Sequence, residues 1–425
     1  MVNQPRITQI NPRNDSITQG DHSVDNNEWR NTLWGEFIEE CSSGATPFRG
    51  QPDYYKGSIK WITSGELNFN FITDTLEHIS EDAVKKTNLK VHPVGTFLMA
   101  ITGLEAAGTR GACGIVGSPA TTNQSCMAIY PTSKLLAEYL YHFYVYKGNE
   151  LALKYCQGTK QQSYTAKIIK ILPIQLPSKI KEQKAIADAL SDTDALIESL
   201  EQIIAKKRLI KQGVMQELLT GKRRLPGFNK EWKYKLIGDF TDCTAGGTPS
   251  TSNPNFWGGS IPWMNSGELH QKMVLTVEGR ITEEGLQNSS TKIIPKDCVL
   301  IGLAGQGKTR GTVAMNKIRL CTNQSIAAIF PNDSFNSKYL YFNLDFRYEE
   351  LRELSTGVGG RGGLNLSIIR SISIPFPPIL EQAAIADFLN DLEAEISFLE
   401  IKRGKVLKIK QGMMQELLTG RIRLS

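Results

Sequence analysis

Eight residues in the second half of the chain match the pattern with which many proteins bind nucleotide phosphates. Gly302-Leu-Ala-Gly-Gln-Gly307-Lys308-Thr309 fits GxxxxGK[ST], in which backbone amides cradle the phosphates and the lysine reaches them. Such a loop follows a strand and opens a helix, whereas the next residues are Arg-Gly-Thr-Val-Ala-Met, which are β-branched and glycine-punctuated. The sequence therefore favours a turn between strands that can touch an anion, with a P-loop NTPase as the alternative.

A second group of residues consists of cationic and amide side chains in glycine-rich loops, which can hydrogen-bond to an anionic or polar ligand. Arg and Lys suit guanine edges and phosphates, Gln suits adenine, and glycine allows a loop to approach a ligand closely. For a nucleic-acid partner, the candidate contact residues are Arg110, Lys160, Gln161, Gln162, Lys308, Arg310 and Arg361. An ordinary surface turn with a solvated side chain is the alternative for each of them.

Other catalytic signatures are missing from the sequence. The five histidines and seven cysteines are scattered, with no HExxH or CxxC spacing, which predicts reduced, buried thiols and no metal site. No nucleophile elbow and no glycine fingerprint for a dinucleotide or adenosylmethionine occurs. We therefore expect no catalytic, cofactor-binding or metal-ligating residue in this chain.

Composition bounds the possible partners. The 425 residues include 49 Lys and Arg against 43 Asp and Glu, so the formal net charge is +6. This weak positive balance permits a nucleic-acid partner without demanding one. No run of 18 apolar residues occurs, and the polar N-terminus has no apolar signal region. We expect a cytoplasmic protein with a flexible tail at residues 1–27.

The chain contains an internal repeat of about 200 residues. Between the segments Glu182 to Leu225 and Glu381 to Leu424, 26 of 44 positions are identical. Shorter motifs match upstream, in the same order. They are Gly44-Ala-Thr46-Pro47 with Gly246-Gly-Thr248-Pro249, Ser64-Gly-Glu-Leu67 with Ser266-Gly-Glu-Leu269, Thr109-Arg110-Gly111 with Thr309-Arg310-Gly311, and Thr122-Asn-Gln-Ser125 with Thr322-Asn-Gln-Ser325. The first half lacks a lysine at the position of Lys308, which argues further against nucleotide binding.

Each nearly duplicated segment predicts a long helix with one apolar stripe. Apolar residues recur at alternating spacings of four and three, as in a coiled coil. The predicted seam residues are Ile186, Leu190, Ile197, Leu200, Ile204, Val214, Leu218, Ile385, Leu389, Leu392, Ile396, Leu399, Val406, Met413 and Leu417. A helix of roughly 39 residues is about 60 Å long and needs a partner for this stripe. An antiparallel coiled coil between the two helices is predicted, and packing of each helix on its own body alone is the alternative.

The repeat divides the chain into five parts. We predict the tail at 1–27, a first body at 28–180, a first long helix at 181–221, a second body at 222–379 and a second long helix at 380–425. The bodies contain short β-rich runs such as Gly95 to Ile101 and Ser325 to Phe330, followed by a short helix. We place Ile168-Ile-Lys170 and Ile368-Ile-Arg370 in the last strands. The fold class is α+β, with two α/β domains joined by two long helices in a pseudo-two-fold repeat.

These repeated motifs resemble a known family. The Gln-Gly-x-Met-Gln-Glu-Leu-Leu-Thr-Gly tail, the Glu-Gln-x-Ala-Ile-Ala-Asp run and the Gly-x-Thr-Pro, Ser-Gly-Glu-Leu and Asn-Gln-Ser marks look like the specificity subunit of type I restriction–modification enzymes. The resemblance extends from Glu28 to the C-terminus. It implies two target recognition domains, each reading one half of a bipartite, asymmetric site in double-stranded DNA. It also implies that the two helices space these domains.

The resemblance also implies partners. Two modification subunits would dock on the chain, and restriction/translocase subunits would join through them, for adenine methylation or cleavage. S-adenosylmethionine, ATP and Mg would then be bound by those partner subunits, and this chain would hold no cofactor and perform no catalysis. A scaffold whose two similar bodies bind protein is a further alternative.

Overall fold

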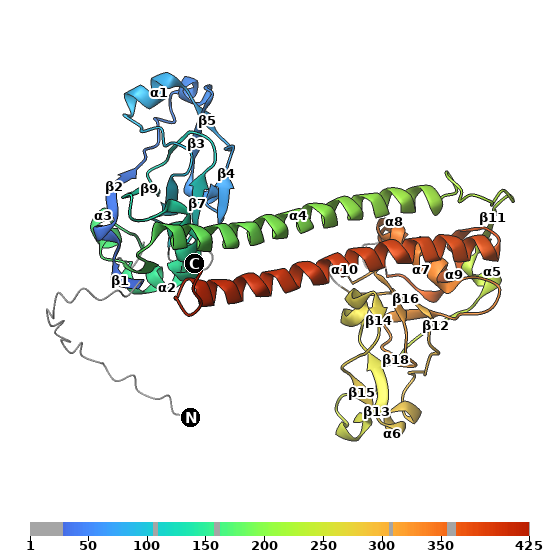
Figure 1. Ribbon diagram of the computed structural model, residues 1–425. Coiled ribbons are helices and arrows are strands. Elements are labelled where there is room, and N and C mark those ends of the chain that lie inside the picture. Colours follow the sequence, from blue (N-terminus) through green and yellow to red (C-terminus); the bar gives the residue numbers. More distant parts are fainter. Residues whose placement is uncertain (1–28, 105–108, 157–161, 306–308, 355–362, 425) are drawn as a thin grey trace. The chain divides into compact units, whose positions relative to one another are not determined.

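The computed structural model describes residues 29–104, 109–156, 162–305, 309–354 and 363–424. The predicted tail at residues 1–27 lies outside this set. The chain divides into two compact units (Figure 1). Unit 1 comprises Met1–Ala195 with Val406–Ser425, and unit 2 comprises Leu196–Lys405. The division falls inside the two long helices, so each helix contributes one part to each unit.

Unit 1 contains three β-sheets with strand orders β2-β9-β6-β7-β4, β5-β3-β8 and β1-β10. Its strands are β1 (Trp29–Leu33), β2 (Ile38–Ser43), β3 (Ile59–Ile62), β4 (Asn70–Ile72), β5 (His78–Ile79), β6 (Phe97–Ala100), β7 (Cys113–Val116), β8 (Ala120–Thr122), β9 (Cys126–Pro131) and β10 (Pro173–Pro177). Its helices are η1 (Trp34–Glu36), η2 (Pro52–Tyr55), η3 (Ser64–Glu66), α1 (Glu81–Lys86), α2 (Ala137–Tyr155) and α3 (Ala166–Lys170), with the first part of α4 (Ile180–Leu218) and the last part of α10 (Ile379–Leu417).

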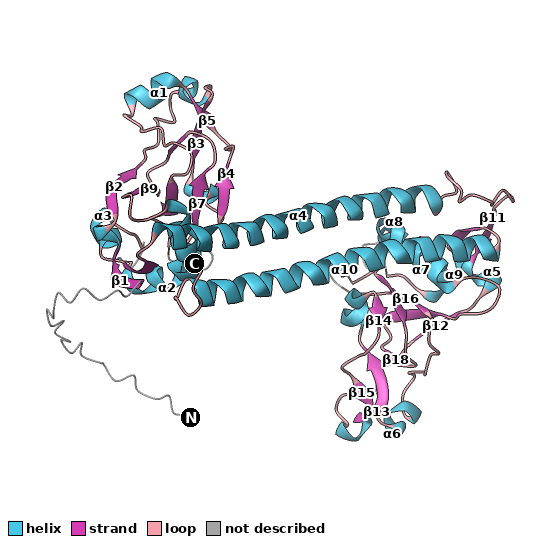
Figure 2. Ribbon diagram, in the orientation of Figure 1, coloured by secondary structure: helices cyan, strands magenta, loops and turns pink. Residues whose placement is uncertain are grey.

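Unit 2 repeats this topology, with strand orders β12-β19-β16-β17-β14, β15-β13-β18 and β11-β20 (Figure 2). Its strands are β11 (Lys233–Leu236), β12 (Cys243–Ala245), β13 (Trp257–Met264), β14 (Met273–Val274), β15 (Arg280–Ile281), β16 (Val299–Gly302), β17 (Val313–Asn316), β18 (Cys321–Thr322), β19 (Ile326–Ile329) and β20 (Ser373–Phe376). Its helices are α5 (Ile237–Phe240), η4 (Pro254–Phe256), η5 (Ser266–Gln271), α6 (Glu283–Gln287), α7 (Ser337–Phe346), α8 (Tyr348–Leu354) and α9 (Leu366–Ser371), with the remaining parts of α4 and α10. The predicted α+β class with two similar domains and two long helices is confirmed.

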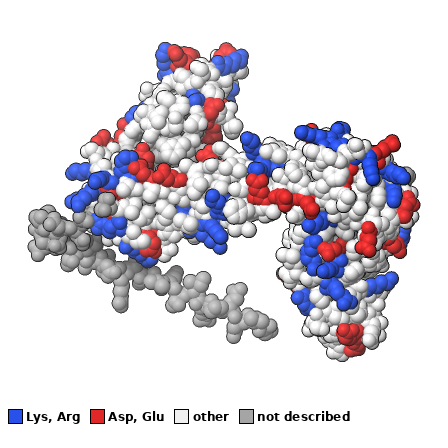
Figure 3. All heavy atoms as spheres, turned by 45° about the vertical axis from the view of Figure 1, so that its right-hand side comes forward, with Lys and Arg blue, Asp and Glu red and all other residues white. Residues whose placement is uncertain are grey.

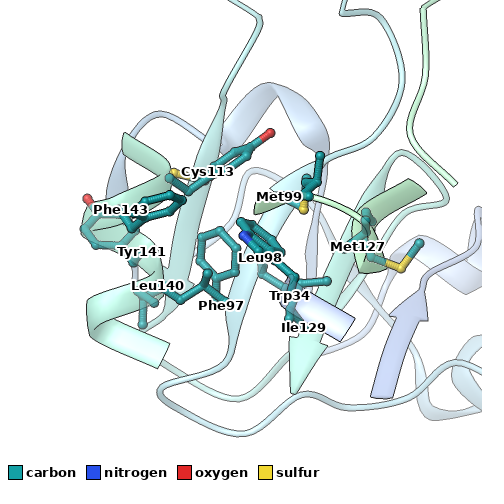
Figure 4. Packing of buried hydrophobic residues seen from close by; sticks show 14 of the residues in the cluster. Trp34, Phe97, Leu98, Met99, Cys113, Met127, Ile129, Leu140, Tyr141 and Phe143 are labelled. Carbon is teal, nitrogen blue, oxygen red and sulfur yellow. The ribbon is translucent and has the colours of Figure 1, made fainter. Parts of the chain in front are cut away.

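The main core of unit 1 lies between the five-stranded sheet and α2 (Figure 4). Every residue of β6 is buried, which explains its continuous apolar sequence. Trp34, Phe97 and Tyr144 meet edge to face, with ring centroids 5.7 to 6.4 Å apart. Such aromatic contacts add to the stabilisation that comes from buried apolar area. Unit 2 has the corresponding core around β16, β17, β19 and α7.

The predicted strands at Ile168-Ile-Lys170 and Ile368-Ile-Arg370 are wrong. Both segments are short helices, α3 and α9. The side chains of Thr165 and Asn365 accept hydrogen bonds from the backbone N–H of Ile168 and Ile368, respectively. This N-cap overrides the β-branched composition, because it satisfies an amide that the first helical turn leaves unpaired.

Helices α4 and α10 each span 39 residues. Gly221 and Gly420 follow them with positive φ of 73° and 71°, respectively. A left-handed residue at this place ends a helix and lets later amides reach its last carbonyls. The amide of Arg223 accordingly donates to the carbonyl of Glu217 at 3.2 Å. The repeated Leu-Leu-Thr-Gly sequence is therefore the terminating motif of both helices.

The seven cysteines are all free, and five of them are buried. Burial raises the pKa of the Cys113 and Cys126 thiols well above the usual range, and that of Cys298 to about 12. These thiols therefore stay protonated and behave as small apolar side chains. The predicted reduced, buried thiols agree with this arrangement.

Candidate nucleic-acid interface

The repeated Gly-x-Thr-Pro and Thr-Asn-Gln-Ser motifs of unit 1 lie against each other. The amide of Ala45 donates to the carbonyl of Thr122 at 3.1 Å, and the hydroxyl of Thr46 donates to Gln124. A Cβ atom at Gly44 would lie only 1.8 Å from the oxygen of Thr122, so only glycine fits there. The motifs thus join the loop after β2 to the turn after β8.

The same contacts recur in unit 2. The amide of Gly247 donates to the carbonyl of Thr322 at 2.8 Å, and Thr248 donates to Gln324 at 2.5 Å. An indole, buried at Trp61 and half-buried at Trp263, completes the arrangement in both units. Trp61 Nε1 donates to the carbonyl of Ala45 at 3.1 Å, and Trp263 Nε1 donates to that of Gly247 at 2.9 Å. The repeated residues are therefore a common framework that holds loops of different sequence.

The Ser-Gly-Glu-Leu motif supplies a positioning carboxylate in each unit. Glu66 accepts from the amides of Thr63 and Leu76, both at 2.8 Å. Glu268 accepts from the amides of Asn265 at 2.9 Å and Glu278 at 3.0 Å. Each glutamate thus ties its own 3-10 turn to a second loop ten residues further on. The motif that marks the repeat therefore also has a positioning role in each unit.

The described ends of the candidate loops in each unit are hydrogen-bonded to each other. In unit 1 the amide of Leu104 donates to the carbonyl of Gln162 at 3.4 Å, and that of Tyr164 donates to Ile101 at 2.9 Å. In unit 2 the amide of Leu364 donates to the carbonyl of Leu303 at 3.1 Å. The loop after β6 or β16 is thereby joined to the segment before α3 or α9. The structure thus brings together the described ends of the two candidate loops in each unit.

The individual candidates fall into two groups. Arg110, Gln162 and Arg310 are described and are half-buried. Lys160, Gln161, Lys308 and Arg361 lie outside the described residues. The site therefore rests on the placement of the loops rather than on the geometry of each side chain.

The two candidate arginines occupy matching turns. Gly111 and Gly311 follow them with φ of 77° and 78°. A Cβ atom at Gly111 would lie 2.9 Å from the amide nitrogen of Asn149 in α2. Both arginines also lie next to residues 105–108 or 306–308, which the structure does not describe. The glycine that follows each arginine therefore lies against a helix, α2 in unit 1 and α8 in unit 2.

The loop that resembles a nucleotide-binding motif connects two antiparallel strands. It leaves β16 at Gly302 and enters β17 at Val313, and Ile301 pairs with Val313. Residues 309–312, where a nucleotide-binding fold would begin a helix, form a turn instead. The predicted turn between strands is confirmed, and the P-loop alternative lacks its helix.

The predicted seam residues are all buried or half-buried. Ile186, Leu190, Ile197, Leu200, Ile204, Leu218, Ile385, Leu389, Ile396, Val406 and Leu417 are buried, and Val214, Leu392, Leu399 and Met413 are half-buried. In unit 1 the start of α4 and the end of α10 join one core, which contains Ile186, Leu190, Met414 and Leu417. In unit 2 the end of α4 and the start of α10 do the same. Packing of each helix on its own body alone is therefore wrong.

Cationic residues interrupt the apolar seam and pair across it. In unit 2, Arg403 contacts Glu201 at 2.5 Å, Lys207 contacts Glu395 at 2.7 Å and Lys211 contacts Glu393 at 3.0 Å. Residue numbers rise along one helix as they fall along the other, so the helices run antiparallel. In unit 1, Lys410 pairs with Asp194 in the same way as Lys211 pairs with Glu393.

A buried glutamate joins the beginning of one long helix to the end of the other. In unit 2, Arg224 donates two hydrogen bonds to Glu381, each 2.5 Å long, and Trp232 Nε1 donates a third at 3.1 Å. In unit 1, Arg423 donates to Glu182 at 2.6 and 2.7 Å, and Trp29 Nε1 donates at 3.3 Å. We call each set a helix clamp.

The indole of each helix clamp also packs on the terminating glycine. A Cβ atom would lie 2.9 Å from the Trp29 ring at Gly420 and 3.1 Å from the Trp232 ring at Gly221. Sequence reasoning missed the clamps, although a signal was present. The Trp, Glu and Arg positions all recur in both halves, but the repeat alone did not pair them.

Charge alone does not mark one binding face. In the view of Figure 3, basic and acidic side chains alternate over both units and most of the surface is neither. Among the described residues, no cluster of three His, Cys, Asp or Glu could hold a metal ion. Within the same residues, no helix has both the length and the apolar character needed to cross a membrane.

Curated relatives of the chain are specificity subunits. The chain is 26% identical over 269 residues to the type I restriction enzyme EcoR124I/EcoR124II specificity subunit of Escherichia coli, covering 61% of this chain and 64% of the relative. It is 34% identical over 166 residues to the MjaIX specificity subunit of Methanocaldococcus jannaschii, covering 38% of each chain.

A solved structure shows the same fold. The S subunit of a type I restriction-modification system from M. genitalium superimposes with a TM-score of 0.63 and 15% identity, covering 93% of this chain and 98% of that one. The family model described as "Type I restriction modification DNA specificity domain" matches residues 26–206 and again 229–408. The chain therefore belongs to the type I restriction-modification DNA specificity family and contains two copies of its domain.

Proposed function

We propose that this DNA specificity subunit reads a bipartite, asymmetric sequence in double-stranded DNA, with one half read by each unit. The main support is that the two units share the framework contacts but differ in the sequence of their loops. Both units hold their loops with the same hydrogen bonds between corresponding backbone atoms, yet the loops differ in sequence. A shared framework with different loops suits two reading surfaces that recognise different half-sites.

The paired loops of each unit are the proposed reading surface. Arg110, Lys160, Gln161 and Gln162 would act in unit 1, and Lys308, Arg310 and Arg361 in unit 2. Arginine can donate two hydrogen bonds to guanine, and glutamine can pair with adenine in the major groove. Lysine and backbone amides add phosphate contacts that position the domain without reading sequence.

Chemistry would reside in partner subunits. In this proposal two modification subunits bind the chain, and restriction/translocase subunits join through them for adenine methylation or cleavage. S-adenosylmethionine, ATP and Mg would be bound by those subunits, and the complex would act in the cytoplasm. Membership of a DNA specificity family supports the division of labour, because specificity and catalysis then lie on separate chains.

The test begins with methylation mapping. The chain is reconstituted with its modification subunits, and methylated bases are mapped on random DNA. We expect one bipartite motif with two different halves. Methylation without a common bipartite motif would refute the proposal.

A unit exchange then asks which unit reads which half. In the variant, residues 229–379 are replaced by residues 26–180, so both domains carry the loops of the first. We expect an inverted repeat of one original half-site, because two identical surfaces would read the same bases. Wild-type protein with the same partner subunits is the control. A variant that still methylates the original asymmetric site would contradict the assignment of one half to each unit.

A further inference from the structure

Two large apolar side chains of unit 1 stand in solvent on neighbouring loops. Phe48 is 72% exposed and Leu76 is 89% exposed. A single exposed apolar residue is common on protein surfaces and needs no explanation. These two residues differ from that case because contacts beneath them hold both loops in place.

An ion pair joins the two loops. The guanidinium of Arg49 donates to both carboxylate oxygens of Glu77, at 2.5 and 2.8 Å. The same guanidinium lies 4.3 Å from the ring centroid of Tyr55 and 5.2 Å from that of Trp61. Arg49 thus joins the two loops at the surface, where its side chain is 55% exposed and that of Glu77 is 36% exposed.

Hydrogen bonds also hold the backbone near Phe48 and at Leu76. The amide of Gln51 donates to the carbonyl of Phe48 at 3.1 Å, which closes a turn around Gly50. A Cβ atom at Gly50 would lie 2.5 Å from two atoms of the Phe48 ring, so the ring lies over this glycine. The amide of Leu76 is held by Glu66 at 2.8 Å. Backbone hydrogen bonds thus hold the two loops that carry the exposed pair.

The residues of unit 2 that align with this exposed pair are polar. The framework motifs align Phe48 with Ser250 and Arg49 with Thr251, and Leu76 aligns with Glu278. A partner subunit bound once by each half would meet similar surfaces in both units. In the proposed function, the DNA half-site is what differs between the two units. The asymmetry therefore favours DNA as the occupant, and this step rests on the proposed function.

We propose that Phe48, supported by Leu76, contacts the 5-methyl group of a thymine in the half-site read by unit 1. Apolar side chains cannot pair with the donors and acceptors of base edges. In the major groove the thymine methyl is the feature that an apolar side chain recognises. The contact adds one base to the specificity of unit 1, beyond those read by polar side chains.

The test compares thymine with deoxyuridine, which lacks only the methyl group. The probes are duplexes that carry the mapped methylation site, with each thymine of the unit 1 half-site replaced singly by deoxyuridine. Binding is measured with the reconstituted methyltransferase. For wild-type protein we expect one replacement to weaken binding about fourfold, as for the loss of one buried methyl group. For Phe48→Ala the same replacement should change nothing.

Two further variants complete the design. Gly50→Ala should displace the Phe48 ring and reduce the thymine preference, while Ser250→Ala, the matched control in unit 2, should leave it intact. Unfolding curves verify that each variant is folded. The proposal is overturned if no thymine methyl in this half-site matters, or if Phe48→Ala weakens thymine and deoxyuridine duplexes equally. If no bipartite site is methylated at all, the proposed function itself fails instead.

Discussion

Each buried glutamate at the start of a long helix accepts two hydrogen bonds from an arginine that follows the other long helix. Glu381 is fully buried in unit 2, and the side chain of Glu182 is 6% exposed in unit 1. A buried carboxylate is tolerated only while it is paired and hydrogen-bonded. The Glu-Gln and Arg-Leu repeats therefore contribute to stability by joining the helix ends.

Removal of one helix clamp tests this role. Arg224→Ala leaves the buried Glu381 without its cation, so we expect the free energy of unfolding of unit 2 to fall by about 3–5 kcal/mol. The second change Glu381→Gln should restore part of this loss, because a neutral amide is cheaper to bury. Chemical denaturation followed by circular dichroism measures both effects.

The matched control for the helix clamp is an exposed ion pair on the same helix. Arg208 contacts Glu400 at 2.5 Å, and their side chains are 64% and 43% exposed. Arg208→Ala should therefore cost under about 1 kcal/mol, since solvent screens such a pair. Equal losses for Arg208→Ala and Arg224→Ala would show that burial of the glutamate is not the cause.

At the scale of elements, two buried histidines distinguish unit 1 from unit 2. His92 precedes β6 and lies within reach of Tyr130 and Thr122, at 2.6 and 3.3 Å. His142 in α2 lies 2.9 Å from Ser191. Burial lowers the pKa of His92 to about 4 and that of His142 to about 3. Ile294 and Phe342 occupy the equivalent positions in unit 2, so this feature belongs to unit 1.

The two histidines predict an acid-sensitive unit 1. The pKa of a histidine is near 6.5 in the unfolded chain and lower in the folded protein. At a pH between these two values, the unfolded chain binds a proton that the folded protein does not. The free energy of unfolding therefore falls as pH falls through this window, by roughly 3 kcal/mol for His92 between pH 7 and pH 4. Urea denaturation at several pH values measures the slope.

The natural residues of unit 2 provide the comparison for this slope. The double variant His92→Ile with His142→Phe should lose stability less steeply than wild-type protein between pH 6.5 and pH 4. The difference between the two proteins cancels the titration of carboxylates common to both. Parallel pH profiles would mean that these histidines do not contribute to acid sensitivity.

At the scale of the whole molecule, both long helices pass from one unit into the other. Lengthening them at the division between units would leave the contacts inside each unit unchanged. Four residues add about 6 Å and 40° of rotation to a helix. One base pair adds about 3.4 Å and roughly 35° to DNA. A four-residue insertion therefore lengthens and rotates a helix by about as much as one or two added base pairs lengthen and rotate the DNA between the half-sites. We call this stretch of DNA the spacer.

The corresponding prediction concerns spacer length. The variant carries two insertions of four residues, one between Ala195 and Leu196 and one between Lys405 and Val406. A coiled coil accommodates four-residue insertions. We therefore expect the preferred spacer to become longer by about one or two base pairs. Both half-site sequences should stay the same. Methylation mapping with the reconstituted complex gives the readout, and a changed half-site would refute the idea that the helices only set the spacing.

Much of this organisation followed from sequence periodicity. The repeat, the two long helices, their apolar seam and the α+β domains all depend on patterns within one segment or between two similar segments. The β-branched residues around Ile168 and Ile368 predicted strands, but both segments are helices because N-cap side chains stabilise their first turns. The seven DNA candidates stay predictions, and their selection rested on residue type and on glycine content alone.

Only the tertiary structure decided which distant side chains meet. Arg224 and Glu381 are 157 residues apart, and Arg423 and Glu182 are 241 residues apart. No local pattern encodes such a pair, because the path of the chain between the two residues determines whether they come together. The path of the chain also determines that Arg49 meets Glu77, and this ion pair joins the loops that carry Phe48 and Leu76. Sequence determined the repeated elements of this specificity subunit, and folding decided which contacts hold their ends and present their loops.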